Sequence, residues 1–148
     1  MRNLLITGLV SAMVLVASYS IVRGQQPAPV SASSLTDGIY SGAQAMRGET
    51  VYGSSCASCH GPMLAGDVGP SLVGKDFIAD FKDGSLGDLL DRIAMTMPQN
   101  APGSLMPAQY ADVLAYMLSM NKYPAGMSEL GSDAAALKVV KMVDPPQP

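Results

Sequence analysis

The chain has 148 residues and a mass of 15.3 kDa, which is room for one compact domain with extensions but not for two domains of ordinary size. Its 9 basic and 12 acidic residues give a net charge of −3, which disfavours a nucleic-acid partner. Tryptophan is absent and phenylalanine occurs only twice, so the protein's own side chains supply few large apolar anchors for a core. A large organic cofactor would have to share that core.

The N-terminus has the pattern of an export signal. Arg2 supplies a positive charge ahead of Leu4–Val22, a run of uncharged and mostly apolar residues. We expect residues 1–24 to be a signal peptide cut before Gln25, or an anchor if they are retained. Without them the net charge is −5. The sequence thus predicts a periplasmic protein that meets the membrane only through a retained segment.

Composition predicts the boundaries of the domain. Residues 25–36 are rich in Pro, Ala and Ser, which is typical of a flexible linker. Residues 144–148 form a Pro-rich tail. The functional domain is therefore expected over residues 37–143.

Apolar periodicity within this domain predicts three helices and no convincing strand, hence an all-α fold. The first covers about 40–54 and contains Gly48, which indicates a close backbone approach because glycine weakens a helix. The second begins at the capping-box pattern Ser85–Asp88 and ends before Pro98. The third starts at Pro107 and ends near Asn121. A long irregular connection is expected from 61 to 84.

Cys56-Ala57-Ser58-Cys59-His60 has the spacing for covalent attachment of a c-type haem. The two thiols add to the haem vinyl groups, and the adjacent imidazole of His60 reaches the iron. A thioredoxin-like disulfide lacks its βαβ context here. A zinc site would need further ligands, whereas the chain holds two cysteines and one histidine in total. We therefore expect one covalently bound haem c.

The second axial position of the iron cannot be a histidine of this chain. Methionine is favoured, because a His/Met pair raises the reduction potential and blocks the iron. Met97 lies at the end of the apolar stripe of the second helix and precedes Pro98, which enforces extended backbone. Met106, in the cap position before Pro107, is the alternative. The remaining alternative is that the second axial position is open, as in a haem-based ligand-binding or sensor protein.

An iron-bound histidine usually donates its other ring N–H to a carbonyl. The loop that begins at Gly69 offers such a group, and the carbonyl of Pro70, ten residues after His60, is the candidate.

The chain resembles the class I cytochromes c from about Gly48 to Leu130. In that family the first helix carries a glycine and an aromatic residue four positions apart, ahead of the haem motif. This helix crosses the last helix at an aromatic residue of the last helix. These positions look like Gly48, Tyr52 and Tyr116. The family's axial methionine maps onto Met97.

A closer likeness is to the cytochrome subunits and domains that serve pyrroloquinoline-quinone-dependent alcohol dehydrogenases. Two departures from these relatives are Phe81, where they often carry Trp, and Met106, where they often carry Ser. The likeness rests on Gly69-Pro70, Thr96-Met97-Pro98, Pro102-Gly103-Ser104-Leu105, Ala115-Tyr116 and Pro124-Ala125-Gly126.

This resemblance implies an electron-transfer protein with no substrate of its own. It would take single electrons from a periplasmic quinoprotein dehydrogenase and pass them to a terminal oxidase or another cytochrome. Because charged residues are only 14% of the chain, we expect docking to be mainly apolar, around Cys56, Met63, Leu64 and the 98–103 loop.

Overall fold

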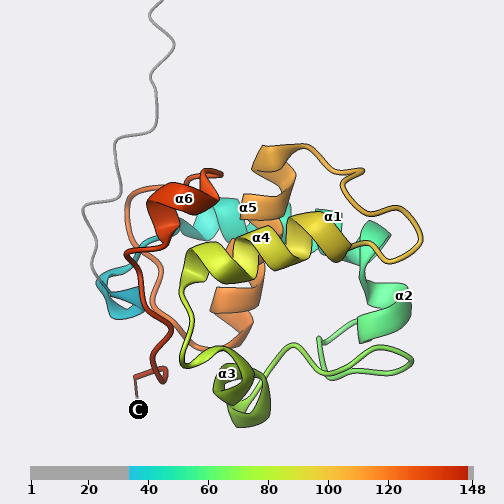
Figure 1. The fold of residues 1–148 in the computed structure, drawn as a ribbon, viewed down its shortest axis with the longest axis horizontal. Coiled ribbons are helices and arrows are strands. Elements are labelled where there is room, and N and C mark those ends of the chain that lie inside the picture. The colour runs from blue at the N-terminus through green and yellow to red at the C-terminus, as the bar shows by residue number, and fades with distance from the viewer. Residues whose placement is uncertain (1–33, 147–148) are drawn as a thin grey trace, which may run out of the picture.

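The computed structural model describes residues 34–146, so the expected signal, most of the expected linker and the end of the tail lie outside the described residues. Within 34–146 the regular elements are all helical, and pairing of extended backbone is limited to isolated bridges. This confirms the predicted all-α fold. No helix in this range is long and apolar enough to cross a membrane. The elements in Figure 1 are the 3₁₀ turn η1 (Leu35–Asp37), α1 (Gly42–Ser55), α2 (Ala57–His60), α3 (Lys75–Phe81), α4 (Leu86–Thr96), α5 (Pro107–Met120) and α6 (Ala134–Leu137).

The three predicted helices are α1, α4 and α5. The capping box of α4 is present: the Asp88 N–H donates to the Ser85 hydroxyl at 3.1 Å, and the Ser85 N–H donates to the Asp88 carboxylate at 3.0 Å. α4 ends at Thr96, and Met97 is extended, with φ −124° and ψ 152°. α5 begins at Pro107, as expected for a proline at the first helical position.

The sequence analysis missed α3, and the prediction of an irregular connection over 61–84 was wrong for these seven residues. α3 has no side-chain cap, because Gly74 precedes it. It buries Phe77 and Ile78, and the rings of Phe77 and Phe81 are 5.2 Å apart. Packing therefore holds this helix rather than local capping, which is why local sequence signals did not reveal it.

Helices α1 and α5 cross in close contact at Gly48. A Cβ atom at this position would lie 1.8 Å from the Asp112 carbonyl oxygen and 3.0 Å from the Tyr116 Cβ. One turn further along α1, the rings of Tyr52 and Tyr116 pack at 5.4 Å. The close backbone approach predicted at Gly48 is confirmed, and so is the crossing of Tyr52 and Tyr116.

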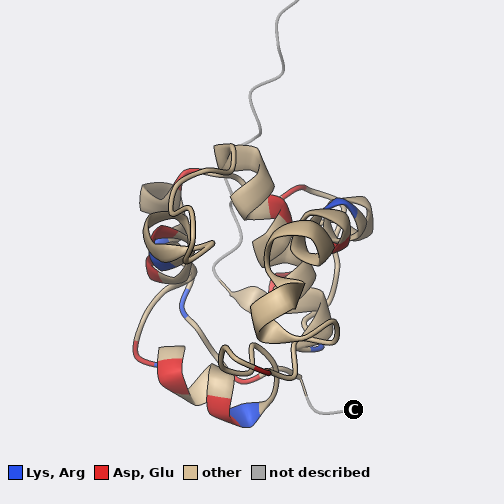
Figure 2. Cartoon of the chain, turned by 90° about the vertical axis from the view of Figure 1, so that its right-hand side faces the viewer, with Lys and Arg blue, Asp and Glu red and all other residues tan. Residues whose placement is uncertain are grey.

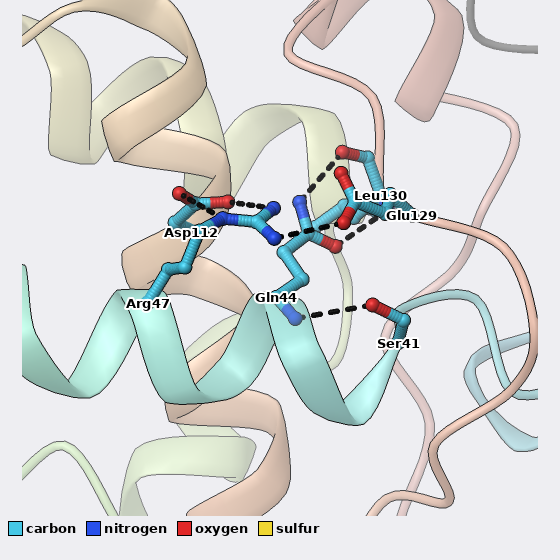
Figure 3. Close-up of polar contacts among 6 residues, drawn as sticks. All are labelled: Ser41, Gln44, Arg47, Asp112, Glu129 and Leu130. Carbon is cyan, nitrogen blue, oxygen red and sulfur yellow. Dashed lines mark hydrogen bonds and ion pairs between the residues drawn. The ribbon is translucent and has the colours of Figure 1, made fainter.

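A polar cluster fastens the N-terminal half of α1 (Figure 3). The Arg47 guanidinium donates two hydrogen bonds to the Asp112 carboxylate, at 3.0 and 3.1 Å, and pairs with Glu129 at 2.9 Å. These partners, Asp112 first, raise the pKa of Arg47. The buried Gln44 amide donates to the Leu130 carbonyl and accepts from the Leu130 N–H, at 2.9 and 2.7 Å. The cluster thus binds α1 both to α5 and to the segment that follows it.

The segment after Leu130 packs over the N-terminal end of α4. Gly87 allows the approach, because a Cβ there would lie 2.2 Å from the Ala134 carbonyl oxygen of α6. The Leu86 N–H donates to the Val140 carbonyl at 2.9 Å. Leu35 is fully buried in the same region, so the packed part of the chain begins before Asp37, inside the expected linker.

Two glycines of α1 give a matched test of the helix crossing. We expect Gly48→Ala to lower the free energy of unfolding by about 3 kcal/mol or more, because its methyl group meets backbone that cannot move aside. Gly53→Ala meets nothing within 4 Å and should raise it by about 0.5–1 kcal/mol through helix propensity. Urea unfolding followed by circular dichroism measures both. Equal effects of the two substitutions would contradict the close crossing.

Candidate functional site

The Cys-x-x-Cys-His motif lies where α1 gives way to α2. Cys56 is both the C-cap residue of α1 and the N-cap residue of α2, with φ −128° and ψ −33°. Its N–H donates to the Tyr52 carbonyl at 2.8 Å. The chain therefore turns at Cys56, and α2 carries Cys59 and His60. Cys56 is half-buried, Cys59 is exposed, and neither forms a disulfide.

Burial, followed by the nearby Cys59, raises the pKa of the Cys56 thiol. Two thiols three residues apart, one capping α2 and one within it, suit addition to the two vinyl groups of a single porphyrin.

His60 is held by the loop that follows it. Its side chain is buried, and its Nδ1 lies 2.8 Å from the carbonyl oxygen of Pro70. A carbonyl only accepts hydrogen bonds, so this contact requires the proton on Nδ1 and leaves the lone pair on Nε2. The structure thus brings together the two residues expected to form this pair, and Nε2 is available to a metal.

The loop from Gly61 to Val73 is organised by bonds to the motif itself. The Gly66 N–H donates to the His60 carbonyl at 2.9 Å, and the Gly69 N–H donates to the Cys59 carbonyl at 2.8 Å. A Cβ at Gly69 would lie 3.0 Å from the His60 ring. A glycine there therefore lets the loop pass close to the imidazole, so that the Pro70 carbonyl can contact it.

Tyr52 is a supporting residue that the sequence analysis assigned only to the helix crossing. Its buried hydroxyl donates to the Gly61 carbonyl at 2.6 Å. Burial, the largest cause, raises the pKa of Tyr52 to about 12, so the hydroxyl keeps its proton at physiological pH. The pattern of aromatic residues could reveal the ring's role but not this bond.

Met97 and Met106 differ in exposure and in backbone contacts. Met97 is half-buried; its N–H donates to the Ile93 carbonyl at 2.9 Å, and its carbonyl accepts from the Tyr110 hydroxyl at 2.8 Å. Met106 is 64% exposed and makes no side-chain cap for α5. The C-terminal end of α4, where Met97 follows, and α2 lie toward the same end of the long axis in Figure 1.

The donor set fits a haem c group. It offers two free thiols and one imidazole whose Nε2 is unblocked. Residues 34–146 contain no group of three His, Cys, Asp or Glu side chains that could hold a bare metal ion. An all-α fold with this attachment site defines a c-type cytochrome.

Comparison with known proteins gives the particular family. Residues 43–117, half of the chain, match the family described as cytochrome c oxidase, cbb3-type, subunit III, and the chain belongs to this family. It is 30% identical over 139 residues to the cbb3-type cytochrome c oxidase subunit FixP of Bradyrhizobium sp. (strain ORS 278). That alignment covers 81% of this chain and 46% of the relative, so the chain spans less than half of the relative's length. No solved structure was found to match.

Membership of this family makes the chain an electron-transfer protein with covalently bound haem c, rather than an enzyme. The haem supplies an iron that exchanges one electron at a time. Cys56, Cys59 and His60 are the residues that would hold it.

Attachment through the motif is testable on the purified protein. Haem should stay with the polypeptide through denaturation and acid–acetone extraction, because thioether bonds survive both. A Cys56→Ala, Cys59→Ala double variant loaded with haem should release essentially all of it in the same extraction. Haem that leaves the unmodified chain would contradict covalent attachment.

Proposed function

We propose that this chain carries single electrons in the periplasm, from a quinoprotein dehydrogenase to a terminal oxidase, through a haem ligated by His60 and Met97. The observation that carries the proposal is the bond from His60 Nδ1 to the Pro70 carbonyl at 2.8 Å. It fixes the tautomer in which Nε2 is free, as an axial ligand requires. Cys56 and Cys59 hold the haem covalently. Export to the periplasm follows from the signal pattern of residues 1–24.

The choice of Met97 as second ligand rests on its position and burial. It is the first residue after α4, in extended backbone, and is half-buried. Met95, two residues earlier in α4, is 75% exposed, and Met106 is 64% exposed. A thioether is a suitable partner for imidazole, since it raises the potential and keeps small molecules from the iron.

The two proposed partners have different support. The donor rests on the short loop sequences shared with the cytochromes of quinoprotein dehydrogenases. The acceptor rests on the family match, whose name is that of an oxidase subunit. The same match supports a second candidate, in which the chain is a fixed subunit of such an oxidase rather than a carrier that moves between complexes.

The proposed docking surface lies around α2 and the connection between α4 and α5. Neither segment has any charge, since Asp, Glu, Lys and Arg are absent from residues 50–66 and from residues 93–111. Figure 2 shows the molecule from the end that carries α2, and much of its ribbon is uncharged there, while α3 at the bottom carries both signs. Met63 is 63% exposed, but Leu64 is fully buried and does not flank the surface as expected.

Reconstituted electron transfer tests the function and the docking surface together. The ferric chain should be reduced by a quinoprotein alcohol dehydrogenase with its substrate, and the ferrous chain should be reoxidised by a cbb3-type oxidase. Because the surface is uncharged, we expect the second-order rates to change by less than about threefold between 10 and 150 mM salt. A steep fall with salt would point to a charged interface.

The control for these rates is a non-cognate copper-protein acceptor, which reports the intrinsic reactivity of the haem. If the oxidase reoxidises the ferrous chain but the dehydrogenase does not reduce the ferric chain, the proposed donor is wrong. Purification of the chain only as part of an oxidase complex would favour the fixed subunit.

Met97→Ala and Met106→Ala form a matched pair for the second ligand. Met97→Ala should abolish the weak red absorption band of Met–iron ligation, lower the reduction potential and allow carbon monoxide to bind the ferrous iron. Met106→Ala should leave all three properties unchanged. Met106→Ser should raise the free energy of unfolding by about 1 kcal/mol, because it supplies the missing cap of α5. The reverse result for the two alanine variants would make Met106 the ligand.

A further inference from the structure

We infer that Tyr110 is the positioning residue for the second iron ligand. The inference rests on the proposed function, because it takes Met97 as that ligand. Tyr110 lies in the first turn of α5, is 4% exposed, and donates its hydroxyl to the Met97 carbonyl at 2.8 Å. It therefore reaches from α5 to the residue that follows α4.

The same hydroxyl also contacts the far end of the connection between the two helices. The Leu105 N–H points to the Tyr110 oxygen at 3.4 Å, so one side chain joins residue 97 to residue 105. Between these ends the connection bonds to itself: the Ala101 N–H donates to the Pro98 carbonyl, and the Ser104 N–H donates to the Ala101 carbonyl. The connection is thus a closed loop whose two ends meet at Tyr110.

These hydrogen bonds restrain the backbone of Met97 and not its side chain. The Met97 N–H is bonded to the Ile93 carbonyl of α4, and its carbonyl is bonded to Tyr110 of α5. The N–H is therefore bonded to one helix and the carbonyl to the other, while the thioether makes no hydrogen bond. Without the hydroxyl, α4 alone would hold Met97, and the loop could swing away from the haem.

The test is Tyr110→Phe in the haem-loaded protein, which keeps the ring and removes only the hydroxyl. Carbon monoxide can bind the ferrous iron only when the methionine leaves it. A neutral hydrogen bond is worth about 1 kcal/mol, so we expect carbon monoxide to bind about fivefold faster than in the unmodified protein. In the ferric protein, the Met–iron band should disappear at a temperature below that of the loss of helix.

Tyr40→Phe is the matched control. Tyr40 is 2% exposed, and its hydroxyl donates to the Tyr123 carbonyl at 2.7 Å, away from the 97–105 connection. It should lower the unfolding temperature without changing the rate of carbon monoxide binding, and its band and helix should disappear together. Tyr110→Phe behaving in the same way would overturn the inference, since its hydroxyl would then be merely structural.

Met97→Ala measured alongside separates the two proposals. If it keeps the Met–iron band, Met97 is not the ligand, and the proposed function fails at that residue together with the role of Tyr110. If it loses the band while Tyr110→Phe binds carbon monoxide at the control rate, only the role of Tyr110 fails.

Discussion

The crossing of α1 and α5 at Gly48 is the contact on which the rest of the site depends. Because a hydrogen stands where any other residue has a Cβ, the Asp112 carbonyl can rest directly against α1. Tyr52 then packs on Tyr116 one turn later, and Cys56 follows one turn after that. The place of the first thiol is thus set by a backbone contact two turns away. The salt bridge from Arg47 to Asp112 and the paired amide of Gln44 keep α1 from sliding along that contact.

The loop from Gly61 to Val73 depends on this arrangement through Tyr52. Its ring packs against Tyr116 at the helix crossing, and its hydroxyl donates to the Gly61 carbonyl at the start of the loop. The loop then returns to the motif, where Pro70 meets His60. Packing of two helices and the tautomer of the histidine are therefore linked through three consecutive contacts. A substitution at the crossing should therefore alter the position of the His60 imidazole, even though the two sites are separated along the chain.

Sequence patterns were sufficient where a local rule dictates structure. The capping box at Ser85 and the proline at position 107 marked the starts of α4 and α5, and a glycine inside a helix marked the crossing. They were insufficient where tertiary contacts decide. The helix α3 has no side-chain cap and exists because Phe77 and Ile78 are buried. Leu35 lies in a segment whose composition is typical of a linker, yet its side chain is fully buried.

The same distinction applies within the site. The spacing of Cys56, Cys59 and His60 is a covalent requirement, so it is visible in the sequence. The Pro70 carbonyl was predictable because its contact needs only a loop of suitable length. The bond from Tyr110 to the Met97 carbonyl was not, because it joins two helices whose relative placement no local pattern determines.

The two proposed axial residues are restrained in different ways, and this bears on which side of the iron opens first. His60 is held through its ring, so the Pro70 bond restrains the same group that would bind the metal. The hydrogen bonds of Met97 are those of its backbone N–H and carbonyl, and three side-chain torsions lie between that backbone and the terminal atoms of the thioether. Its sulfur can therefore adjust to the iron, but it also leaves more easily. The thioethers proposed at Cys56 and Cys59 would also hold the haem close to His60, so displacement by an external ligand should occur on the methionine side, at a rate that the 97–105 loop closure would set.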